Sequence, residues 1–436
     1  MRLSVIGCGY LGAVHAAAMA SIGHDVVGVD VDAEKVEALS HGRAPIFEPG
    51  LQGILAEGVE SGRLAFTTDI GSAAGAAVHF VGVGTPQKPG GHSADLTYVY
   101  EAFDQLLPHL AAGDVVAGKS TVPVGTAARL SGRVAQTGAT LVWNPEFLRE
   151  GWAVQDTVDP DRLVVGVPAG EHGERAADIL REVYHTAVAK GTPFLVTDYA
   201  TAELVKVAAN AFLATKISFI NAIAEIAEAT GADVTQLADA IGYDARIGRR
   251  FLGAGIGFGG GCLPKDIRAF SARAEELGRA ESIAFLREVD AINVRGRERA
   301  AELVVGAFDG LVLGKKVAVL GAAFKPHSDD VRDSPALDVA AKLKGLGADV
   351  VVTDPQALAN AARTHPQLTY TESLDEALRG ADAVIVVTEW DEYRRHLSPE
   401  HAASLTSGRV IVDGRNCLDR EAWRAAGWTY LGMGRP

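Results

Sequence analysis

The stretch Leu3-Ser4-Val5-Ile6-Gly7-Cys8-Gly9-Tyr10-Leu11-Gly12 decides the fold of the first part of the chain. Its apolar start is typical of a buried strand, and the G-x-G-x-x-G spacing leads into an alanine-rich segment typical of a helix. Gly7 allows a tight turn, Gly9 lets a pyrophosphate approach the backbone, and Gly12 lets the helix pack on the strand. Together these features predict a dinucleotide-binding α/β fold.

The end of the next strand predicts which dinucleotide binds. Val26 to Val29 form a second apolar run, and Asp30 follows directly. A carboxylate at this point accepts hydrogen bonds from a ribose diol and repels a 2′-phosphate, so NAD is favoured over NADP. Asp32 is an alternative ribose acceptor two residues further on.

Further apolar runs over residues 78–83, 115–119 and 163–167 predict that a parallel sheet continues. Ligands of such sheets bind beyond the carboxyl ends of the strands, where Thr85 and Thr121 are placed. The two threonines are therefore candidates to contact a cofactor or substrate. As isolated residues, they would more often serve turns or helix caps.

Two polar segments stand out in the middle of the chain. In Asn144-Pro145-Glu146-Phe147-Leu148-Arg149-Glu150-Gly151, a helix starting after Pro145 would place Glu146 and Glu150 on one face. A long helix is predicted from Thr197 to Thr230, with Gly231 as its stop. Glu203, Lys206 and Asn210 form one polar stripe on it. The alternatives are a solvated face around Arg149, a surface ion pair between Glu203 and Lys206, and a core-satisfied Asn210.

The segment Phe258-Gly259-Gly260-Gly261-Cys262-Leu263-Pro264-Lys265-Asp266 carries the strongest candidate for a nucleophile. Pro264 is favourable in the first turn of a helix, so Cys262 is expected just before a helix N-terminus. That position and the adjacent Lys265 favour the thiolate, which is the reactive form of cysteine. The alternative is a small apolar cysteine in a glycine-rich turn.

A second α/β unit is predicted after Gly314, with strands at 316–320, 350–353, 383–387 and 410–412. Its first strand leads into Gly321-Ala322-Ala323-Phe324-Lys325-Pro326, which lacks G-x-G-x-x-G, so we expect no second standard dinucleotide site. Lys325 and Arg415 fall at carboxyl ends of strands, where ligands bind. Arg332 is a further candidate, and Arg246-Ile247-Gly248-Arg249-Arg250 is a candidate phosphate clamp or a solvated face.

Composition excludes several classes of function. A chain of 436 residues with 48% hydrophobic residues predicts a soluble protein of two or three domains. The formal net charge of −14 argues against nucleic acid and anionic membranes as partners. Three cysteines make no disulfide framework and fit a reducing compartment, and no uninterrupted apolar run is long enough to span a membrane. We expect a cytoplasmic protein without a metal site.

Across nearly its whole length the sequence resembles the UDP-glucose/GDP-mannose dehydrogenase family. The resemblance is carried by the first glycine motif, Ser120-Thr121-Val122-Pro123, residues 144–151, Lys206 with Asn210, residues 258–266, Gly321 to Lys325, and Asp413-Gly414-Arg415. Arg246-Ile247-Gly248 followed by Phe251-Leu252 is most similar to the UDP-glucose 6-dehydrogenases of the family. Two positions depart from the pattern: Gly261 stands where relatives often have serine, and Gly253 where some have lysine, which removes one phosphate contact.

The resemblance implies two successive NAD-dependent oxidations of the C6 alcohol of a sugar nucleotide, UDP-glucose being favoured, through a thiohemiacetal and a thioester on Cys262. The implied catalytic residues are Cys262, Lys206, Asn210, Asp266, Glu146 and Thr121. The implied cofactor-binding residues are Gly7, Gly9, Tyr10, Leu11, Gly12, Asp30, Lys35, Thr85, Pro86, Thr121, Glu150, Cys262, Lys265 and Arg332. The implied substrate-binding residues are Glu146, Phe147, Leu148, Glu150, Lys206, Asn210, Arg246, Phe251, Gly257, Phe258, Gly259, Phe324, Lys325 and Arg415.

The expected architecture is two Rossmann-like, doubly wound parallel-sheet domains joined by a long central helix and a helical dimerisation region. The expected boundaries are 1–197 for NAD binding, 198–310 for the central region with the nucleophile loop, and 311–436 for sugar-nucleotide binding. The resemblance further implies a homodimer or larger assembly, in which Arg246 acts from a neighbouring subunit. Alternative substrates are GDP-mannose, UDP-N-acetylhexosamines and dTDP-glucose. Alternative activities are a one-step 3-hydroxyacid dehydrogenase and a catalytically silent sensor.

Overall fold

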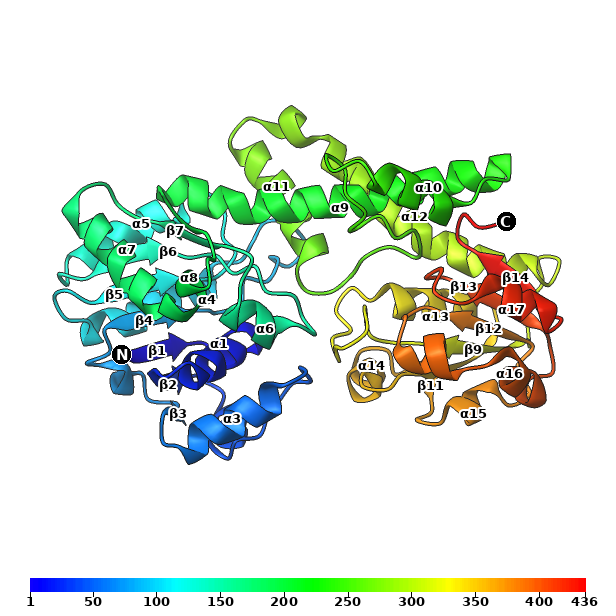
Figure 1. The fold of residues 1–436 in the computed structure, drawn as a ribbon, viewed down its shortest axis with the longest axis horizontal. Coiled ribbons are helices and arrows are strands. Elements are labelled where there is room, and N and C mark those ends of the chain that lie inside the picture. Colours follow the sequence, from blue (N-terminus) through cyan, green and yellow to red (C-terminus); the bar gives the residue numbers. More distant parts are fainter. The chain divides into compact units, whose positions relative to one another are not determined.

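A computed structural model describes residues 1–436, which divide into two compact units. The first unit comprises residues 1–209 and 269–280, and the second comprises residues 210–268 and 281–436. Each unit contains one sheet flanked by helices, as Figure 1 shows. The predicted architecture of two Rossmann-like parallel sheets with a long helix is therefore confirmed, whereas the exact domain boundaries stay a prediction.

The first unit contains an eight-stranded sheet of order β3-β2-β1-β4-β5-β6-β7-β8, parallel except where β6 meets β7. Neighbours β1 and β4 are not consecutive in sequence, so the chain reverses its direction of winding between them, where such sheets bind ligands. The strands are β1 (Arg2–Ile6), β2 (Asp25–Val29), β3 (Leu64–Thr67), β4 (Val78–Val81), β5 (Val115–Gly118), β6 (Thr140–Trp143), β7 (Leu163–Gly166) and β8 (Phe194–Thr197).

Helices cover both faces of this sheet because successive strand side chains point to opposite sides. Leu3 and Val5 of β1 join one apolar cluster with α1 and α7, while Ile6 joins a second cluster with α4 and α5. The helices are α1 (Tyr10–Ser21), α2 (Ala33–Ser40), α3 (Leu51–Glu60), α4 (Thr97–Leu106), α5 (Thr126–Ala135), α6 (Ala153–Val158), α7 (Glu171–Val183) and α8 (His185–Ala189), with short 3₁₀ turns at Ile70–Ala73 and Leu107–His109.

The second unit contains a six-stranded parallel sheet of order β11-β10-β9-β12-β13-β14. Its strands are β9 (Lys316–Leu320), β10 (Asp349–Thr353), β11 (Thr369–Tyr370), β12 (Ala383–Val386), β13 (Val410–Asp413) and β14 (Thr429–Gly432). Its helices are α10 (Val234–Gly242), α12 (Phe285–Gly306), α13 (Pro335–Gly345), α14 (Leu358–Thr364), α15 (Leu374–Leu378), α16 (Pro399–Leu405) and α17 (Arg420–Ala425), with a π-turn at Glu392–His396 and a 3₁₀ turn at Ala280–Ile283.

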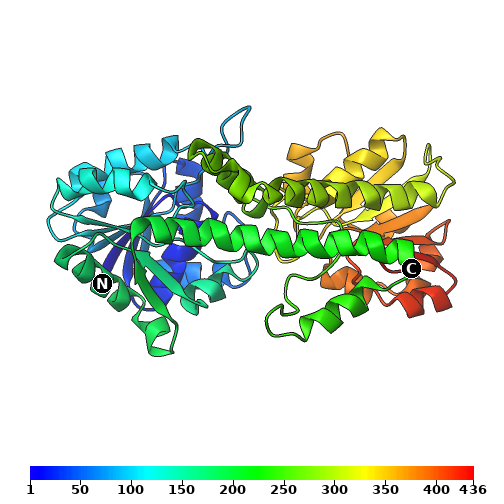
Figure 2. The same ribbon diagram turned by 90° about the horizontal axis from the view of Figure 1, so that it is seen from above.

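Two helices span the division between the units: α9 (Tyr199–Thr230) and α11 (Leu263–Glu276). Figure 2 shows α9 as one uninterrupted helix. It ends at Thr230 as predicted, and Asp233 caps the next helix by accepting the N–H groups of Thr235 and Gln236. By length and composition α9 is the one helix that could cross a membrane, although Lys206, Asn210 and Lys216 interrupt its apolar sequence. This is weak evidence, because core helices of soluble proteins pass the same test and 44% of its most apolar window is buried.

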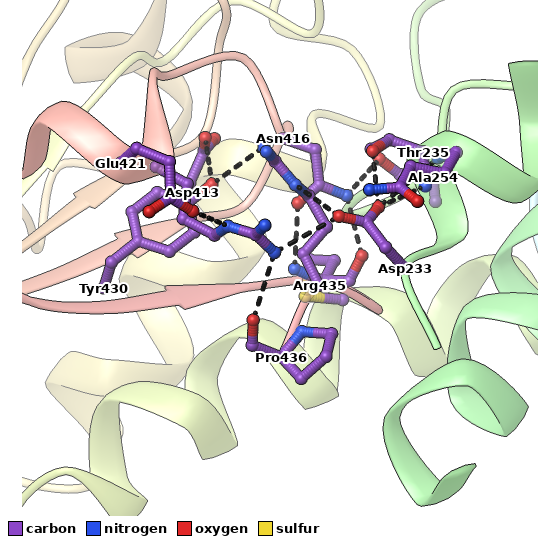
Figure 3. Close-up of polar contacts among 12 residues, drawn as sticks. Asp233, Thr235, Ala254, Asp413, Asn416, Glu421, Tyr430, Arg435 and Pro436 are labelled. Carbon is purple, nitrogen blue, oxygen red and sulfur yellow. Dashed lines mark hydrogen bonds and ion pairs between the residues drawn. The ribbon is translucent and has the colours of Figure 1, made fainter. Parts of the chain in front are cut away.

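The carboxyl-terminal residues are tied to the start of α10 (Figure 3). The Val234 N–H donates to the Gly434 carbonyl over 2.9 Å, and the Gly434 N–H donates to Glu228 over 2.7 Å. Asp233 forms ion pairs with Arg420 and Arg435 at 3.2 and 3.7 Å. The last strand of the second sheet is thereby fixed to the end of α9.

Candidate active site

The turn after β1 has the backbone geometry that the glycine motif predicts. Gly7 has a φ of +87°, and a Cβ there would lie 2.7 Å from Val83. A Cβ on Gly12 would lie 1.8 Å from the Gly7 carbonyl oxygen, so only glycine lets α1 pack so closely. No side chain caps the N-terminus of α1 at Gly9, and a Cβ on Gly9 would meet no atom within 4 Å. An open, uncapped helix start fits a pyrophosphate.

Asp30 lies at the end of β2 and is 8% exposed. Its carboxylate accepts the Cys8 N–H at 2.7 Å and the Asp32 N–H at 3.0 Å, and it pairs with the Lys35 ammonium at 3.0 Å. The alternative acceptor, Asp32, instead caps α2 by accepting the Lys35 N–H. Both carboxylates have partners, so the assignment of the ribose to Asp30 stays a prediction.

Two predicted cofactor residues meet beyond the carboxyl ends of β4 and β5. The Thr85 hydroxyl, after β4, donates to the Thr121 carbonyl, after β5, over 2.9 Å. Leu11 packs close to Gly82, and Pro86 is exposed. The Tyr10 hydroxyl donates to the buried Glu48, which was not predicted as a functional residue.

Glu48 also fixes the loop that contains Glu150. Its two carboxylate oxygens accept the N–H groups of Gly151 at 2.6 Å and Ala153 at 2.7 Å. Glu150 itself is buried. The one sequence signal for Glu48 is its position as the acidic residue between Pro45 and Pro49.

The structure contains no helix directly after Pro145, so the condition for placing Glu146 and Glu150 on one helix face is not met. Residues 144–149 have no regular structure, and α6 begins only at Ala153. The Glu146 side chain accepts the N–H groups of Phe147 and Leu148, at 2.8 and 3.1 Å, and so holds a local turn. Glu146 and Glu150 therefore do not lie at helical spacing.

The residues of the polar stripe on α9 have different partners from one another. Glu203 is 2% exposed and accepts the N–H groups of Gly125 and Ala127, each at 2.7 Å, at the start of α5. Burial raises the pKa of Glu203, although these N–H donors oppose the rise. The alternative of a Glu203–Lys206 surface pair is therefore not what the structure contains. The Lys206 ammonium instead lies 5.4 Å from the centre of the Phe147 ring.

In the second unit, Cys262 directly precedes α11, as predicted, and Cys262 is exposed. The other two cysteines are less accessible, and burial raises the pKa of both the Cys8 and the Cys417 thiols. A buried neutral thiol is a poor nucleophile. Cys262 is therefore the cysteine best placed to react.

Asp266 and Asn210 form a hydrogen-bonded pair in the same unit. The Asn210 amide donates to Asp266 Oδ2 over 2.7 Å, and the Lys265 ammonium lies 2.7 Å from Asp266 Oδ1. Asp266 is 2% exposed and lies one helical turn after Cys262. Asn210 is itself buried, so the contact also fits the alternative of an asparagine satisfied within the core, and its role in the site stays a prediction.

Three asparagines hold the loop that leads to Cys262. Asn293 of α12 accepts the Phe258 N–H at 2.7 Å and donates to the Phe258 carbonyl at 2.9 Å. Asn221 accepts the Gly255 N–H at 2.9 Å, and Asn416 donates to the Ala254 carbonyl at 3.1 Å (Figure 3). None of the three was predicted, since a lone asparagine has no characteristic spacing. The three side chains supply hydrogen-bond partners for backbone N–H and carbonyl groups of a loop that pairs with no strand.

Predicted substrate residues gather on the same loop. The Arg415 guanidinium donates to the carbonyls of Gly257 at 2.7 Å and Phe324 at 3.2 Å. Gly260 has a φ of +83°, and a Cβ there would lie 2.7 Å from the Phe324 ring. The Lys325 ammonium lies 5.3 Å from the centre of that ring. Arg415 thus already fixes two segments that carry candidate residues.

Other predicted residues lie near or outside this loop. The Arg332 carbonyl accepts the Gly260 N–H at 2.8 Å, and its guanidinium pairs with Asp330. A serine side chain at Gly261 would meet that guanidinium, since a Cβ there lies 2.3 Å from Arg332 Cζ. Arg246 is 89% exposed and pairs with Asp244, and Phe251 is exposed with a φ of +66°. Within this chain the structure does not bring Arg246 to the loop.

The second sheet uses its equivalent of Asp30 differently. Asp354 follows β10, as Asp30 follows β2, but it accepts the N–H groups of Ala322, Ala323, Gln356 and Ala357 and the indole N–H of Trp390. Five donors at 2.7 to 3.0 Å occupy both carboxylate oxygens. Asp354 is thus engaged in fixing the turn after β9. No group of three or more His, Cys, Asp or Glu side chains in residues 1–436 could hold a metal ion.

A Rossmann-like sheet with an uncapped glycine turn and Asp30 defines the class of an NAD-dependent oxidoreductase. Three models of the UDP-glucose/GDP-mannose dehydrogenase family match the chain: the NAD binding domain over residues 1–188, the central domain over 200–295 and the UDP binding domain over 318–420. The chain belongs to this family, and its cofactor is NAD.

Individual relatives match the chain from end to end. It is 42% identical over 441 residues to a UDP-glucose 6-dehydrogenase of Rhizobium meliloti, covering 100% of both chains. It is 41% identical to the UDP-glucose 6-dehydrogenase TuaD of Bacillus subtilis, covering 100% of this chain and 93% of the relative. A solved UDP-glucose dehydrogenase from Pyrobaculum islandicum is 40% identical, with a TM-score of 0.90 and coverage of 100% and 98%. The protein is an oxidoreductase that acts on a sugar nucleotide.

Proposed function

We propose that this protein oxidises C6 of UDP-glucose twice and releases UDP-glucuronate. The single observation that carries the proposal is the pairing of Asn210 with Asp266 one helical turn after the exposed Cys262. An acid, an amide and an accessible thiol form the set that a covalent oxidation and its hydrolysis require. The relatives at 42% and 41% identity, both UDP-glucose 6-dehydrogenases, support UDP-glucose over GDP-mannose, UDP-N-acetylhexosamines or dTDP-glucose.

The chemistry proceeds through Cys262. Oxidation of the C6 alcohol gives an aldehyde, and Cys262 Sγ bonds to the aldehyde carbon to form a thiohemiacetal. Oxidation of the thiohemiacetal gives a thioester, and water then breaks the C–S bond to release the carboxylate and the thiol. Bound NAD supplies a two-electron, hydride-accepting oxidant, so two NAD molecules balance the four electrons that the substrate loses. Covalent capture prevents the reactive aldehyde from leaving between the two oxidations.

The candidate acid, base and donor groups divide between the steps. Lys206 and Asn210 donate to the oxygen on which negative charge develops, where one donor is worth about 3 kcal/mol. Asp266 and Glu146 are the candidates to remove protons, from the alcohol and from the hydrolytic water, with Thr121 contributing a hydroxyl at the strand end. The pairing of Asp266 with two donors keeps its carboxylate in one orientation.

The remaining candidates bind the two ligands. On the cofactor side we propose Gly7, Gly9, Tyr10, Leu11, Gly12, Asp30, Lys35, Thr85, Pro86, Thr121, Glu150, Cys262, Lys265 and Arg332. On the substrate side we propose Glu146, Phe147, Leu148, Glu150, Lys206, Asn210, Phe251, Gly257, Phe258, Gly259, Phe324, Lys325 and Arg415. Arg246, which is 89% exposed, joins the substrate side from a second copy of the chain.

An exposed apolar stripe on α9 supports a dimer. Phe212, Phe219 and Ile226 recur every seven residues and are 67%, 50% and 61% exposed. Residues seven apart lie on one helix face, and large exposed apolar side chains on one face mark an interaction surface. We propose that a second copy covers this stripe, that residues 198–310 form the dimerisation domain between domains 1–197 and 311–436, and that the protein works in the cytoplasm.

The proposed function is tested by measuring NADH from a panel of sugar nucleotides. With limiting UDP-glucose the yield is expected to be two NADH per molecule, and the other nucleotides are expected to react far more slowly. One NADH per molecule would instead indicate a one-step dehydrogenase. The Cys262→Ser variant is expected to stall, and a fully active serine variant would reject the covalent route.

A further inference from the structure

Lys119, at the end of β5, is a buried cation inside the first unit. Its side chain is 3% exposed, although lysine is almost never fully buried unless it is paired. Its ammonium lies 3.1 Å from Glu146 Oε2 and donates to Asn144 Oδ1 at 3.1 Å and to the Tyr184 hydroxyl at 3.3 Å. The strands β5 and β6 and the helix α7 that bring these residues together are labelled in Figure 1.

Lys119 completes the set of donors around Glu146. Glu146 Oε1 accepts the N–H groups of Phe147 and Leu148, so the Lys119 ammonium is the charged donor for Oε2. The carboxylate is 14% exposed and is held from both sides in one rotamer. A carboxylate in such a position needs its cation, because an unpaired buried charge is strongly unfavourable.

The groups that face this pair come from several elements. Tyr184 follows α7, and its hydroxyl donates to Asn144 Oδ1 at 2.8 Å. His15 of α1 packs on the rings of Phe80 and Tyr184. Lys206 and Arg162 lie over the ring of Phe147, the residue after Glu146.

The protonation states of these neighbours are consistent with one buried cation. Burial by itself lowers the pKa of Lys119, but the Glu146 carboxylate and Tyr184 outweigh burial, so the pKa lies above its ordinary value. Burial raises the pKa of Tyr184 and, with the Lys119 charge, holds the pKa of His15 well below its ordinary value. Tyr184 and His15 are therefore neutral at pH 7, and Lys119 is the cation that compensates Glu146.

We propose that Lys119 is a positioning residue that holds the Glu146 carboxylate in one orientation for the hydrolysis of the Cys262 thioester. The inference rests on the role of Glu146 in the proposed function. The sheet itself does not need this cation, since the flanking strand residues of β5 and β6 are apolar and buried. Asn144 and Tyr184 satisfy the Lys119 ammonium beside Glu146, and a buried ion pair adds little net stability, so we assign this pair to holding the Glu146 carboxylate.

The test compares pH–rate profiles of the full-length enzyme with UDP-glucose and NAD. Lys119→Met removes the charge, and Lys119→Gln removes it while keeping a hydrogen-bond donor for Glu146 and Asn144. In both variants the acid limb of kcat is expected to move upward by about 1–3 pH units, because a carboxylate without its cation ionises at higher pH. An unmoved acid limb in a folded Lys119→Gln variant would overturn the proposal.

A double-variant cycle separates this role from a merely structural one. In a Glu146→Gln background, Lys119→Gln is expected to change kcat by less than about twofold, since residues that act as one unit are not additive. An equal loss in both backgrounds would show that Lys119 acts independently of Glu146. If Glu146→Gln retains full activity, the role of Glu146 and the present proposal both fail while the oxidation of UDP-glucose stands. If wild-type enzyme makes no NADH from UDP-glucose, the proposed function itself fails.

Discussion

The side-chain amide of Asn210 donates a 2.7 Å hydrogen bond to Asp266 Oδ2, and so joins α9 to the first turn of α11 behind Cys262. Asp266 is buried and also pairs with Lys265. Neither partner can be removed without changing the environment of the other, so variants of the two residues are informative together.

Asp266→Asn is expected to lower kcat by about 10²–10⁴-fold, the usual contribution of a positioned acid or base. The amide cannot remove a proton, while its size preserves the contact with Asn210. Stopped-flow and steady-state NADH formation check the rate, and titration with NAD checks that the dissociation constant is unchanged. Asp239→Asn, at an exposed carboxylate on α10, is the matched control and should retain full activity. An active Asp266→Asn enzyme would remove Asp266 from the mechanism.

Asn293→Ala is expected to destabilise the loop before Cys262. The variant leaves the buried Phe258 N–H without an acceptor, whereas Arg297 still donates to the Phe258 carbonyl at 3.0 Å. An unsatisfied buried donor costs about 1–3 kcal/mol in the free energy of unfolding. Urea unfolding measures this loss, and iodoacetamide should then alkylate Cys262 faster because the loop opens more often. An unchanged free energy of unfolding would show that Asn293 does not stabilise the loop at Phe258.

Asp30 is expected to set the preference for NAD over NADP. A 2′-phosphate beside this carboxylate should cost about 2–3 kcal/mol, or roughly 10²-fold in kcat/KM. Asp30→Ser should lower the ratio of kcat/KM for NAD to kcat/KM for NADP, because NAD binds more weakly to the variant. Asp32→Ala is the control: it removes the cap of α2 and should lower stability by about 1 kcal/mol without changing the KM for NAD. If Asp32→Ala raised the KM for NAD and Asp30→Ser did not, Asp32 would be the residue that binds the ribose.

The buried His15 is expected to make the protein less stable as the pH falls. It is fully buried, both ring nitrogens lack hydrogen-bond partners, and burial together with Lys119 holds its pKa well below the ordinary value. Below about pH 6.5 the unfolded chain binds a proton that the folded chain does not, so stability is lost as pH falls, by at most about 1.4 kcal/mol per pH unit. His15→Leu should flatten the dependence of stability on pH between about pH 5 and 6.5. An equally steep dependence in the variant would contradict a neutral His15.

Phe219→Glu is expected to disrupt the proposed dimer. A charge in the middle of the stripe formed by Phe212, Phe219 and Ile226 would be desolvated on association. Light scattering after size exclusion should show a dimer or larger assembly for the wild type and a monomer for the variant. Glu225→Gln, outside the stripe on the same helix, is the matched control. A monomeric wild-type protein would contradict the dimer.

Much of the fold followed from local patterns. The strands at Val26 to Val29 and Lys316 to Leu320 are continuous apolar runs between turn signals, and the structure contains them within a residue or two. Strands β3, β8, β11 and β14 were not predicted, because they lie at sheet edges where half-exposed side chains give no apolar run. The central strand β6 was also missed, since its apolar run is only Leu141 to Trp143 before Asn144. Edge strands are defined by their partners, and the sequence of the strand alone does not contain that information.

The candidate site was predictable where chemistry and spacing coincide. Cys262 precedes a helix as Pro264 indicated, and Thr85 and Thr121 meet because both end neighbouring strands. The buried Glu203 cap and the Lys119–Glu146 pair were not predicted, since each joins residues distant in sequence. The conditional helix after Pro145 is absent, and the Glu146 side chain instead accepts the N–H groups of Phe147 and Leu148 in an irregular segment.

The most direct test of the covalent route is mass spectrometry of the enzyme quenched in acid during turnover of UDP-glucose with NAD. Acid preserves a thioester, so the peptide that contains Cys262 should carry the mass of the oxidised sugar nucleotide. The adduct should be absent without NAD, and the corresponding peptide of the Cys262→Ser variant should be unmodified. An enzyme that yields two NADH per UDP-glucose with an unmodified Cys262 peptide, under conditions in which hydrolysis of the intermediate limits turnover, would contradict the account.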